Sequence, residues 1–186
     1  MQYFFVAGQH SSLPQRPEAA ADRTLYHADL DQGGDVEATV SWNGPALDDA
    51  GSGMSFVGRT GSGHVLSMDG APAEGGGPLG GRNLAPRPME VVLVGTGGCT
   101  AYDVVLILRR GRHDVTRCDV TLTAERAPTD PKVFTAIHFH FVVVGHALKH
   151  EVVDRAIRLS HDKLCSASVM LAKTAVLSHS FEIREG

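Results

Sequence analysis

Residues 88–105 read PMEVVLVGTGGCTAYDVV, and this stretch decides how the rest of the chain is interpreted. Its proline suits the first turn of a helix, where the missing N–H is tolerated, and Glu90 suits the positive end of the helix dipole. The helix should be apolar on almost every face, and therefore buried, as far as Leu108, and should end at Arg109–Gly111. Each glycine in its GTGG segment costs about 0.8–1 kcal/mol relative to alanine, which predicts that another helix packs closely there.

A second helix is predicted from about Lys149 to Ala175, because its apolar residues recur at helical spacing. It carries Cys165 within KLCSAS, whose small side chains also favour close packing. Cysteines on two tightly packed helices could meet, and a disulfide needs Cα atoms about 4.4–6.8 Å apart. The residues alone equally allow Cys99 and Cys165 to be plain buried thiols. Cys118, on a predicted strand, is expected to be structural.

Strands are predicted around these helices, each from an alternating or continuous apolar pattern. They cover residues 35–42, 54–59, 64–68, 115–125, 134–144 and 179–183. The order β-β-β-α-β-β-α-β does not alternate strictly, which predicts an α+β fold with mainly antiparallel sheets.

Residues 1–35 are interpreted as an N-terminal extension and residues 36–186 as the folded domain. Residues 70–87 hold six glycines and three prolines, which predicts a surface loop or a loop bordering the site.

Composition argues against several classes of partner. The net charge is −4 and no basic run exceeds Arg109-Arg110, so no nucleic-acid surface is expected. No uninterrupted apolar stretch approaches the roughly 18 residues of a membrane span, and no secretory signal is recognised, so we expect a cytoplasmic protein with no membrane partner. In that compartment cysteines are thiols, and any disulfide is transient and catalytic. Neither a cofactor nor a metal is expected.

The segments 88–105 and 163–168, whose cysteines are 66 residues apart, resemble the two cysteine motifs of the OsmC-like family. The resemblance covers roughly residues 36–185. It implies two central cysteine helices packed on antiparallel sheets, in an intertwined homodimer with sites between the subunits. The best-known branches reduce organic hydroperoxides. By that resemblance Cys99 would attack the O–O bond and become a sulfenic acid, Cys165 would resolve it to a disulfide, and an external dithiol would reduce the disulfide.

The sequence departs from the family's peroxidases beside the reactive thiol. Their Pro-Glu pair orients an arginine against that thiol, whereas this chain has Met89 at the matching position. Glu90 follows one residue later, about 100° further around the helix. Arg82, in the preceding loop, is the first candidate for the activating cation, and Arg59 is the next. The candidate catalytic set is therefore Cys99, Cys165, Arg82 and Glu90.

Asp103 opposes activation, because it lies four residues after Cys99 on the same helix face and a nearby anion raises a thiol pKa. The pattern GGCTAYDVV at residues 97–105 resembles a poorly characterised branch of the family more closely than the proven peroxidases. The alternative function is a non-enzymatic binding protein that holds a small acyl-like or thiol ligand in the helix crevice. His161, four residues before Cys165, leaves open a Cys–His acyl-transfer enzyme, or is simply an exposed histidine.

His138 and His140 point to one face of a predicted strand. Two histidines form at most half of a metal site, and no third ligand is evident in the sequence. Strand polarity toward solvent explains them equally well.

Overall fold

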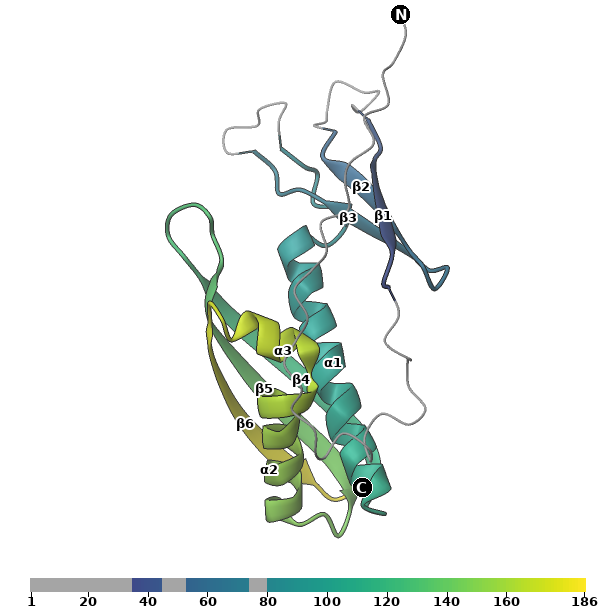
Figure 1. Cartoon of the computed structure of the whole chain (residues 1–186), viewed down its shortest axis with the longest axis vertical. Helices are drawn as coiled ribbons and strands as arrows, with labels where there is room; N and C mark the ends of the chain where they lie inside the picture. Colours follow the sequence, from purple (N-terminus) through teal and green to yellow (C-terminus); the bar gives the residue numbers. More distant parts are fainter. Residues whose placement is uncertain (1–34, 45–52, 74–79) are drawn as a thin grey trace, which may run out of the picture. The chain divides into compact units, whose positions relative to one another are not determined.

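The structure is a computed structural model that describes residues 35–44, 53–73 and 80–186 (Figure 1). The predicted extension, residues 1–35, lies almost entirely outside these described residues. The described chain forms the predicted α+β fold, with two three-stranded sheets.

The first sheet is an antiparallel meander of β1 (Ala38–Trp42), β2 (Ser55–Thr60) and β3 (Val65–Asp69). The turn between β2 and β3 is the predicted glycine-rich one. Gly63 has a φ of 86°, a conformation that glycine adopts without strain. The predicted hairpin is therefore confirmed.

The second sheet has the order β4-β5-β6, formed by β4 (Asp114–Arg126), β5 (Phe134–His146) and β6 (Val176–Arg184). β4 and β5 are antiparallel, but β5 and β6 are parallel, so the prediction that the helices pack on antiparallel sheets was wrong for this strand pair. The reason is the helical segment that connects β5 to β6, because a crossover of this length returns the chain in the same direction.

The first cysteine helix, α1 (Pro88–Arg110), begins and ends as predicted. Glu90 Oε2 accepts a hydrogen bond of 2.9 Å from the Arg87 N–H, which gives the N-cap amide a partner. Helix α1 is not buried all round, however. Its buried residues form a single stripe of Thr96, Gly97, Thr100, Val104 and Leu108. Among the described elements, β4 and the helical segment that connects β5 to β6 make the main contacts with α1.

Helix α1 also has the length and composition of a membrane span: it has 23 residues, with a mean hydropathy of 1.9 over an 18-residue window. The expectation that no stretch reaches that length was wrong, because it counted only uninterrupted apolar runs and stopped at the glycines and threonines. A helix in a protein core meets the same criterion, and the buried stripe of α1 packs in that way.

The predicted second helix is broken into three parts. Helix α2 (His150–Leu159) passes into one π-helical turn, η1 (Ser160–Leu164), and α3 (Ser166–Leu171) follows. Cys165 separates η1 from α3 with an extended backbone, φ −71° and ψ 105°. The prediction of one continuous helix over 149–175 was therefore wrong, and the break occurs at the cysteine itself.

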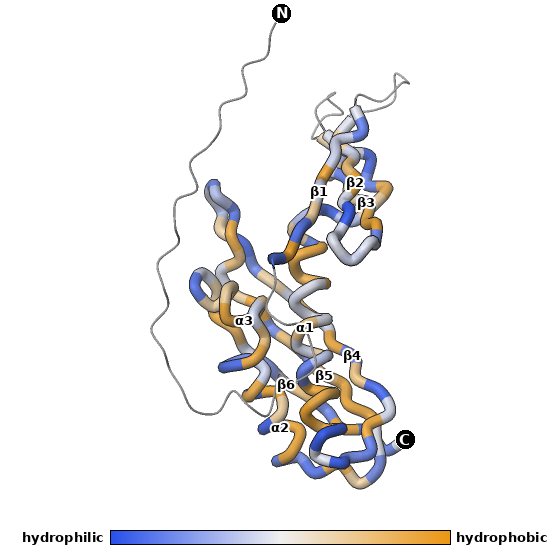
Figure 2. The backbone as a smooth tube through the Cα atoms, turned by 45° about the vertical axis from the view of Figure 1, so that its right-hand side comes forward, coloured by the Kyte–Doolittle hydropathy of each residue, from blue (hydrophilic) through white to orange (hydrophobic). Residues whose placement is uncertain are grey.

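The main core lies between the second sheet and the helices, and β5 contributes its alternate residues to it. Figure 2 shows hydrophobic segments along α1 and the strands of this sheet. The fully buried large side chains are Val104, Leu108, Ile137, Phe139, Phe141, Val143, Val153 and Ile157. This core fixes the positions of α1 and η1, and through them the positions of the cysteines.

The glycines of α1 do not admit the second cysteine helix, contrary to the prediction. A Cβ on Gly97 would lie 2.6 Å from Leu122 Cδ1, so Gly97 allows α1 to approach β4. A Cβ on Gly95 or Gly98 would meet no described atom within 4 Å. These two glycines face open space in the described chain.

Candidate functional site

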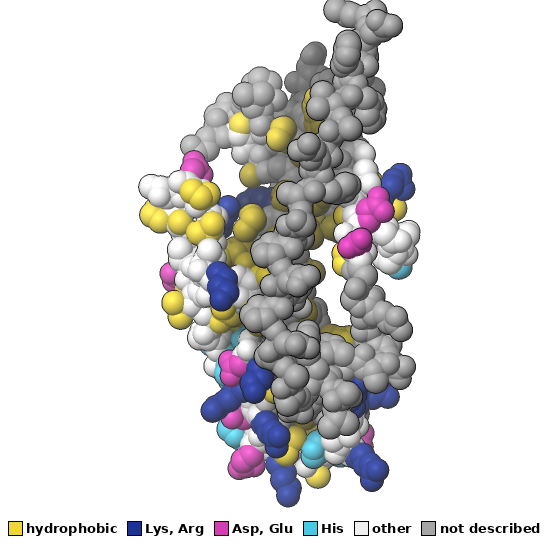
Figure 3. All heavy atoms as spheres, in the orientation of Figure 1, with side chains coloured by type: hydrophobic (Ala, Val, Ile, Leu, Met, Phe, Trp, Pro, Cys, Tyr) yellow, Lys and Arg dark blue, Asp and Glu magenta, His cyan; other side chains and the backbone are white. Residues whose placement is uncertain are grey.

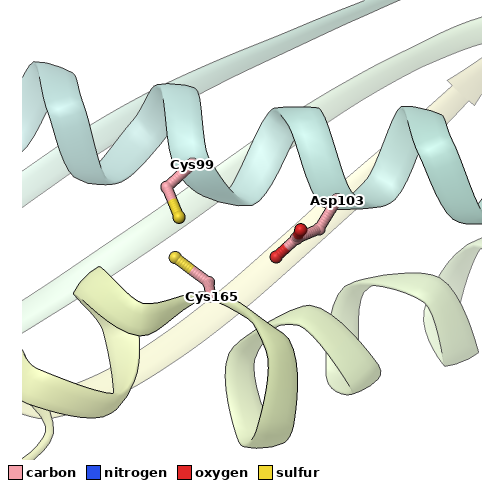
Figure 4. A group of neighbouring side chains, drawn as sticks. All are labelled: Cys99, Asp103 and Cys165. Carbon is pink, nitrogen blue, oxygen red and sulfur yellow. The ribbon is translucent and has the colours of Figure 1, made fainter. Parts of the chain in front are cut away.

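Cys99 and Cys165 meet between α1 and the break before α3. Figure 4 shows their sulfur atoms pointing toward one another, with the Asp103 carboxylate beside them. The two Sγ atoms and a carboxylate oxygen of Asp103 all lie within 4.8 Å of one another. The predicted proximity of the two cysteines is therefore confirmed.

Backbone amides from the start of α3 donate to both sulfurs. The Ser168 N–H donates to Cys165 Sγ at 3.4 Å, so this cysteine side chain caps α3. The Ala167 N–H donates to Cys99. Cys165 is fully buried, whereas Cys99 is partly exposed, so reagents reach the pair from the side of Cys99.

Asp103 is oriented by a residue from the π-helical turn. The Ser160 hydroxyl donates a hydrogen bond of 2.9 Å to Asp103 Oδ2. Ser160 is fully buried and begins η1, and its carbonyl accepts from the Cys165 N–H at 2.9 Å. One residue thus connects the carboxylate on α1 to the backbone that positions Cys165. Ser160 was not among the predicted site residues, although its signal in the sequence is a serine on the apolar stripe of the predicted helix.

The site keeps Cys99 in the thiol form. Burial, the hydrogen bond with Cys165, and the charges of Cys165 and Asp103 raise the pKa of Cys99 to about 11, while the Ala167 N–H lowers it. The direction of the Asp103 effect is the one that the sequence predicted. Among the described groups that shift the pKa of Cys99 there is no cation.

Alkylation of Cys99 by iodoacetamide should therefore accelerate steeply with pH. Below a pKa of about 11 the thiolate fraction rises about tenfold per pH unit, and only the thiolate reacts. Asp103→Asn should lower that pKa and speed the reaction at neutral pH, because the variant removes a nearby negative charge. Mass spectrometry of the Cys99 peptide measures both rates. A rate that levels off near pH 7 would contradict the raised pKa.

The other two predicted catalytic residues make contacts away from the two sulfurs: the Arg82 backbone bonds to Asp69, and the Glu90 side chain bonds to the Arg87 N–H. The backbone N–H groups of Arg82 and Leu84 each donate to Asp69 Oδ2 at 3.0 Å, and the Gly70 N–H donates to Asp69 Oδ1 at 2.7 Å. These bonds hold the pKa of Asp69 below its usual value and anchor both ends of the glycine-rich loop. Glu90 caps α1. Activation of Cys99 by Arg82 stays a prediction.

His161 is buried, so the interpretation of an exposed histidine was wrong. Its ring centroid lies 4.5 Å from that of Phe139, and it also contacts Phe141 and His179. Burial, and next the charge of His179, lower the pKa of His161 to about 4. Its Nε2 atom has no hydrogen-bond partner among the described residues. His161 is thus a neutral core side chain at neutral pH.

The ring nitrogens of His138 and His140 form hydrogen bonds with serine hydroxyls. Both nitrogens of His138 lie 2.9 Å from a hydroxyl, that of Ser178 or Ser180, and His140 Nδ1 lies 2.9 Å from the Ser180 hydroxyl. His138 and His140 are therefore explained as polar side chains on one face of the strand, without a metal.

An open groove of about 610 Å³ lies between α1 and β4. Gly97 and Gly98 form part of its wall on α1, and Cys118 and Leu122 form part of its wall on β4. Burial, and next the charge of Asp119, raise the pKa of Cys118 to about 11. The groove is a second feature of α1, apart from the Cys99–Cys165 pair.

Known proteins are similar to this chain in sequence and in fold. The family described as OsmC-like protein matches residues 80–180. Protein YhfA of Escherichia coli (strain K12) is 45% identical over 148 residues, which span 80% of this chain and 98% of that protein. A hypothetical protein from Aquifex aeolicus VF5 has a TM-score of 0.64 at 24% identity, covering 82% of this chain and 98% of that one. An organic hydroperoxide resistance protein OsmC from Legionella pneumophila has a TM-score of 0.57 at 14% identity, covering 82% and 99%.

Proposed function

The chain belongs to the OsmC-like protein family, and from this we propose that it reduces organic hydroperoxides with Cys99 and Cys165. The observation that carries the proposal is the pair of sulfurs, which lie within 4.8 Å of one another. A peroxide-reducing dithiol needs its second thiol within reach of the sulfenic acid formed on the first. The name of the Legionella pneumophila relative, an organic hydroperoxide resistance protein, supports this substrate class.

The reaction follows ordinary thiol chemistry. The Cys99 thiolate attacks the terminal oxygen of ROOH, the O–O bond breaks, and the alkoxide takes a proton to leave as ROH. Cys99 is then a sulfenic acid. The Cys165 thiol attacks its sulfur and expels water, which leaves a Cys99–Cys165 disulfide. An external dithiol reduces this disulfide by exchange and becomes oxidised itself.

Turnover of cumene hydroperoxide with a dithiol reductant tests the proposal. Cys99→Ser should abolish turnover, because a serine hydroxyl cannot replace the attacking sulfur. Cys165→Ser should remove the dithiol-dependent cycle but keep a single oxidation of Cys99. Cys118→Ser is the matched control and should retain activity, because Cys118 lies on β4 in the separate groove. Equal turnover in wild type and Cys99→Ser would refute the proposal. Arg82→Ala tests the predicted activation, since it should slow turnover if Arg82 assists Cys99.

A ligand-binding function is the second candidate, and two observations favour it. The pKa of Cys99, about 11, makes it a weak nucleophile at neutral pH. The groove between α1 and β4 is lined mainly by apolar side chains and could hold a small acyl-like ligand. Absence of turnover in wild type, together with saturable binding of a fluorescent fatty acid, would favour this function.

We propose further that the protein is a homodimer acting in the cytoplasm. Apolar side chains on α1 are exposed in the described chain, including Val94 at 73% and Tyr102 at 52%. Figure 3 likewise shows hydrophobic side chains reaching the surface on the face in view. A second copy covering this side of α1 would remove that apolar area from water.

Light scattering should give about twice the chain mass of 19.8 kDa at micromolar concentration. Val94→Glu should shift the protein to the monomer, because it places a charge on the proposed interface. Val176→Glu is the matched control: Val176 is also 73% exposed, but on β6, and its substitution should leave the dimer intact. A wild-type particle with the mass of one chain would exclude the dimer.

A further inference from the structure

We propose that Cys99, Asp103 and Cys165 bind one divalent cation, with Zn²⁺ as the best fit. The three side chains offer two sulfurs and one carboxylate oxygen, all within 4.8 Å of one another (Figure 4). The sequence predicted no metal, because Asp103 was interpreted only as an anion that opposes a thiolate. This site does not depend on peroxide chemistry.

The spacing of the three atoms suits a tetrahedral ion after a small contraction. Zn–S bonds of about 2.3 Å and Zn–O bonds of about 2.0–2.2 Å place tetrahedral ligand atoms about 3.5–3.8 Å apart. Because the atoms lie within 4.8 Å of one another, each pair must approach by about 1.3 Å at most. Cys99 and Asp103 are one helical turn apart on α1 and face the same side, so a rigid element presents two of the three ligands.

The surroundings of the ligands also resemble those of metal sites. Ser160 Oγ donates to Asp103 Oδ2 at 2.9 Å, and such partners orient the carboxylates that bind metals. The N–H groups of Ala167 and Ser168 donate to the two sulfurs, which stabilises thiolates bound to a cation. The ligands are thus held by hydrogen bonds from η1 and α3.

The donor atoms select the class of cation. Two thiolates favour Zn²⁺ over Mg²⁺ or Ca²⁺, which prefer oxygen ligands. Binding exchanges the two thiol protons for the ion and oxidises nothing. Three protein ligands leave a fourth position for water or another small ligand. A thiol pair bound to the ion is withheld from oxidants, so the metal-bound and peroxide-reducing states exclude one another.

Titration of the reduced, chelator-treated full chain with Co²⁺ tests the site. We expect one Co²⁺ per chain, with the sulfur-to-cobalt charge-transfer absorption of thiolate ligation, and displacement of Co²⁺ by Zn²⁺. Cys99→Ser, Cys165→Ser and Asp103→Asn should each weaken binding more than tenfold. Ser160→Ala, which removes only the orienting hydrogen bond, should weaken it about 10–100-fold. Cys118→Ser is the control and should bind as the wild type does.

The result that would overturn the site is either absence of stoichiometric binding at micromolar protein, or binding that Asp103→Asn leaves unchanged. Asp103→Asn is isosteric, and its unfolding curve shows whether a loss of binding reflects a loss of folding. Metal binding is measured without hydroperoxide, and turnover is measured with a chelator present. Failure of one proposal is therefore distinguishable from failure of the other.

Discussion

One equivalent of organic hydroperoxide should convert the reduced chain quantitatively into an intramolecular Cys99–Cys165 disulfide. The sulfurs start within 4.8 Å of one another, and a disulfide bond is about 2.05 Å long, so side-chain rotation and a small shift of the break before α3 suffice. The product should be two hydrogen masses lighter than the reduced chain, with one peptide pair linked after proteolysis without reductant.

Cys165→Ser separates this intramolecular route from other oxidations. The variant should form no intramolecular link, and its Cys99 should accumulate as a sulfenic acid that dimedone traps. The serine hydroxyl can still accept from the Ser168 N–H, so α3 keeps its cap. Cys118→Ser should form the disulfide as the wild type does. A linked Cys99–Cys118 pair in the wild type would contradict the assignment.

Phe139→Ala should lower the free energy of unfolding by about 3–5 kcal/mol. The Phe139 side chain is fully buried on β5, and its ring packs edge-on against His161, with centroids 4.5 Å apart. The truncation leaves a cavity beneath η1, the turn that leads into Cys165. Urea denaturation followed by circular dichroism measures the change.

Val176→Ala is the control for Phe139→Ala. Val176 lies in the same sheet but is 73% exposed, so its truncation should change the free energy of unfolding by less than about 0.5 kcal/mol. All variants are compared at one chain concentration, because association contributes to the stability of a dimer. Equal effects of the two truncations would mean that β5 does not form the core.

The sequence predicted α1 accurately because its ends depend on local signals. Pro88 and Glu90 act within the first turn, where Glu90 accepts from the N-cap amide, and the two arginines before Gly111 act within the last turn. The proximity of Cys99 and Cys165 followed from a family resemblance, and the structure agrees with it.

The break at Cys165 could not be predicted in the same way, because apolar residues recur at helical spacing on both sides of it, through 149–175. The break accompanies a contact between distant residues, the hydrogen bond from Ser160 to Asp103, and no local pattern reveals such a contact. The burial of His161, in contrast, could have been predicted from its helical spacing. It lies in η1, four residues after Ile157, where the buried stripe of α2 continues, and this position outweighs its polar type.

The hydrogen bond from the Ser168 N–H to Cys165 Sγ links the oxidation state of one sulfur to the backbone of a helix. In the reduced chain this amide proton has a sulfur acceptor at 3.4 Å. Cys165 Sγ already points toward Cys99, and closing the gap from within 4.8 Å to the disulfide length of about 2.05 Å should draw it away from the Ser168 N–H and weaken this cap. The deuterium-exchange rate of the Ser168 amide should therefore be higher in the oxidised chain than in the reduced chain. This rate reports the redox state of the cysteine pair without an added label.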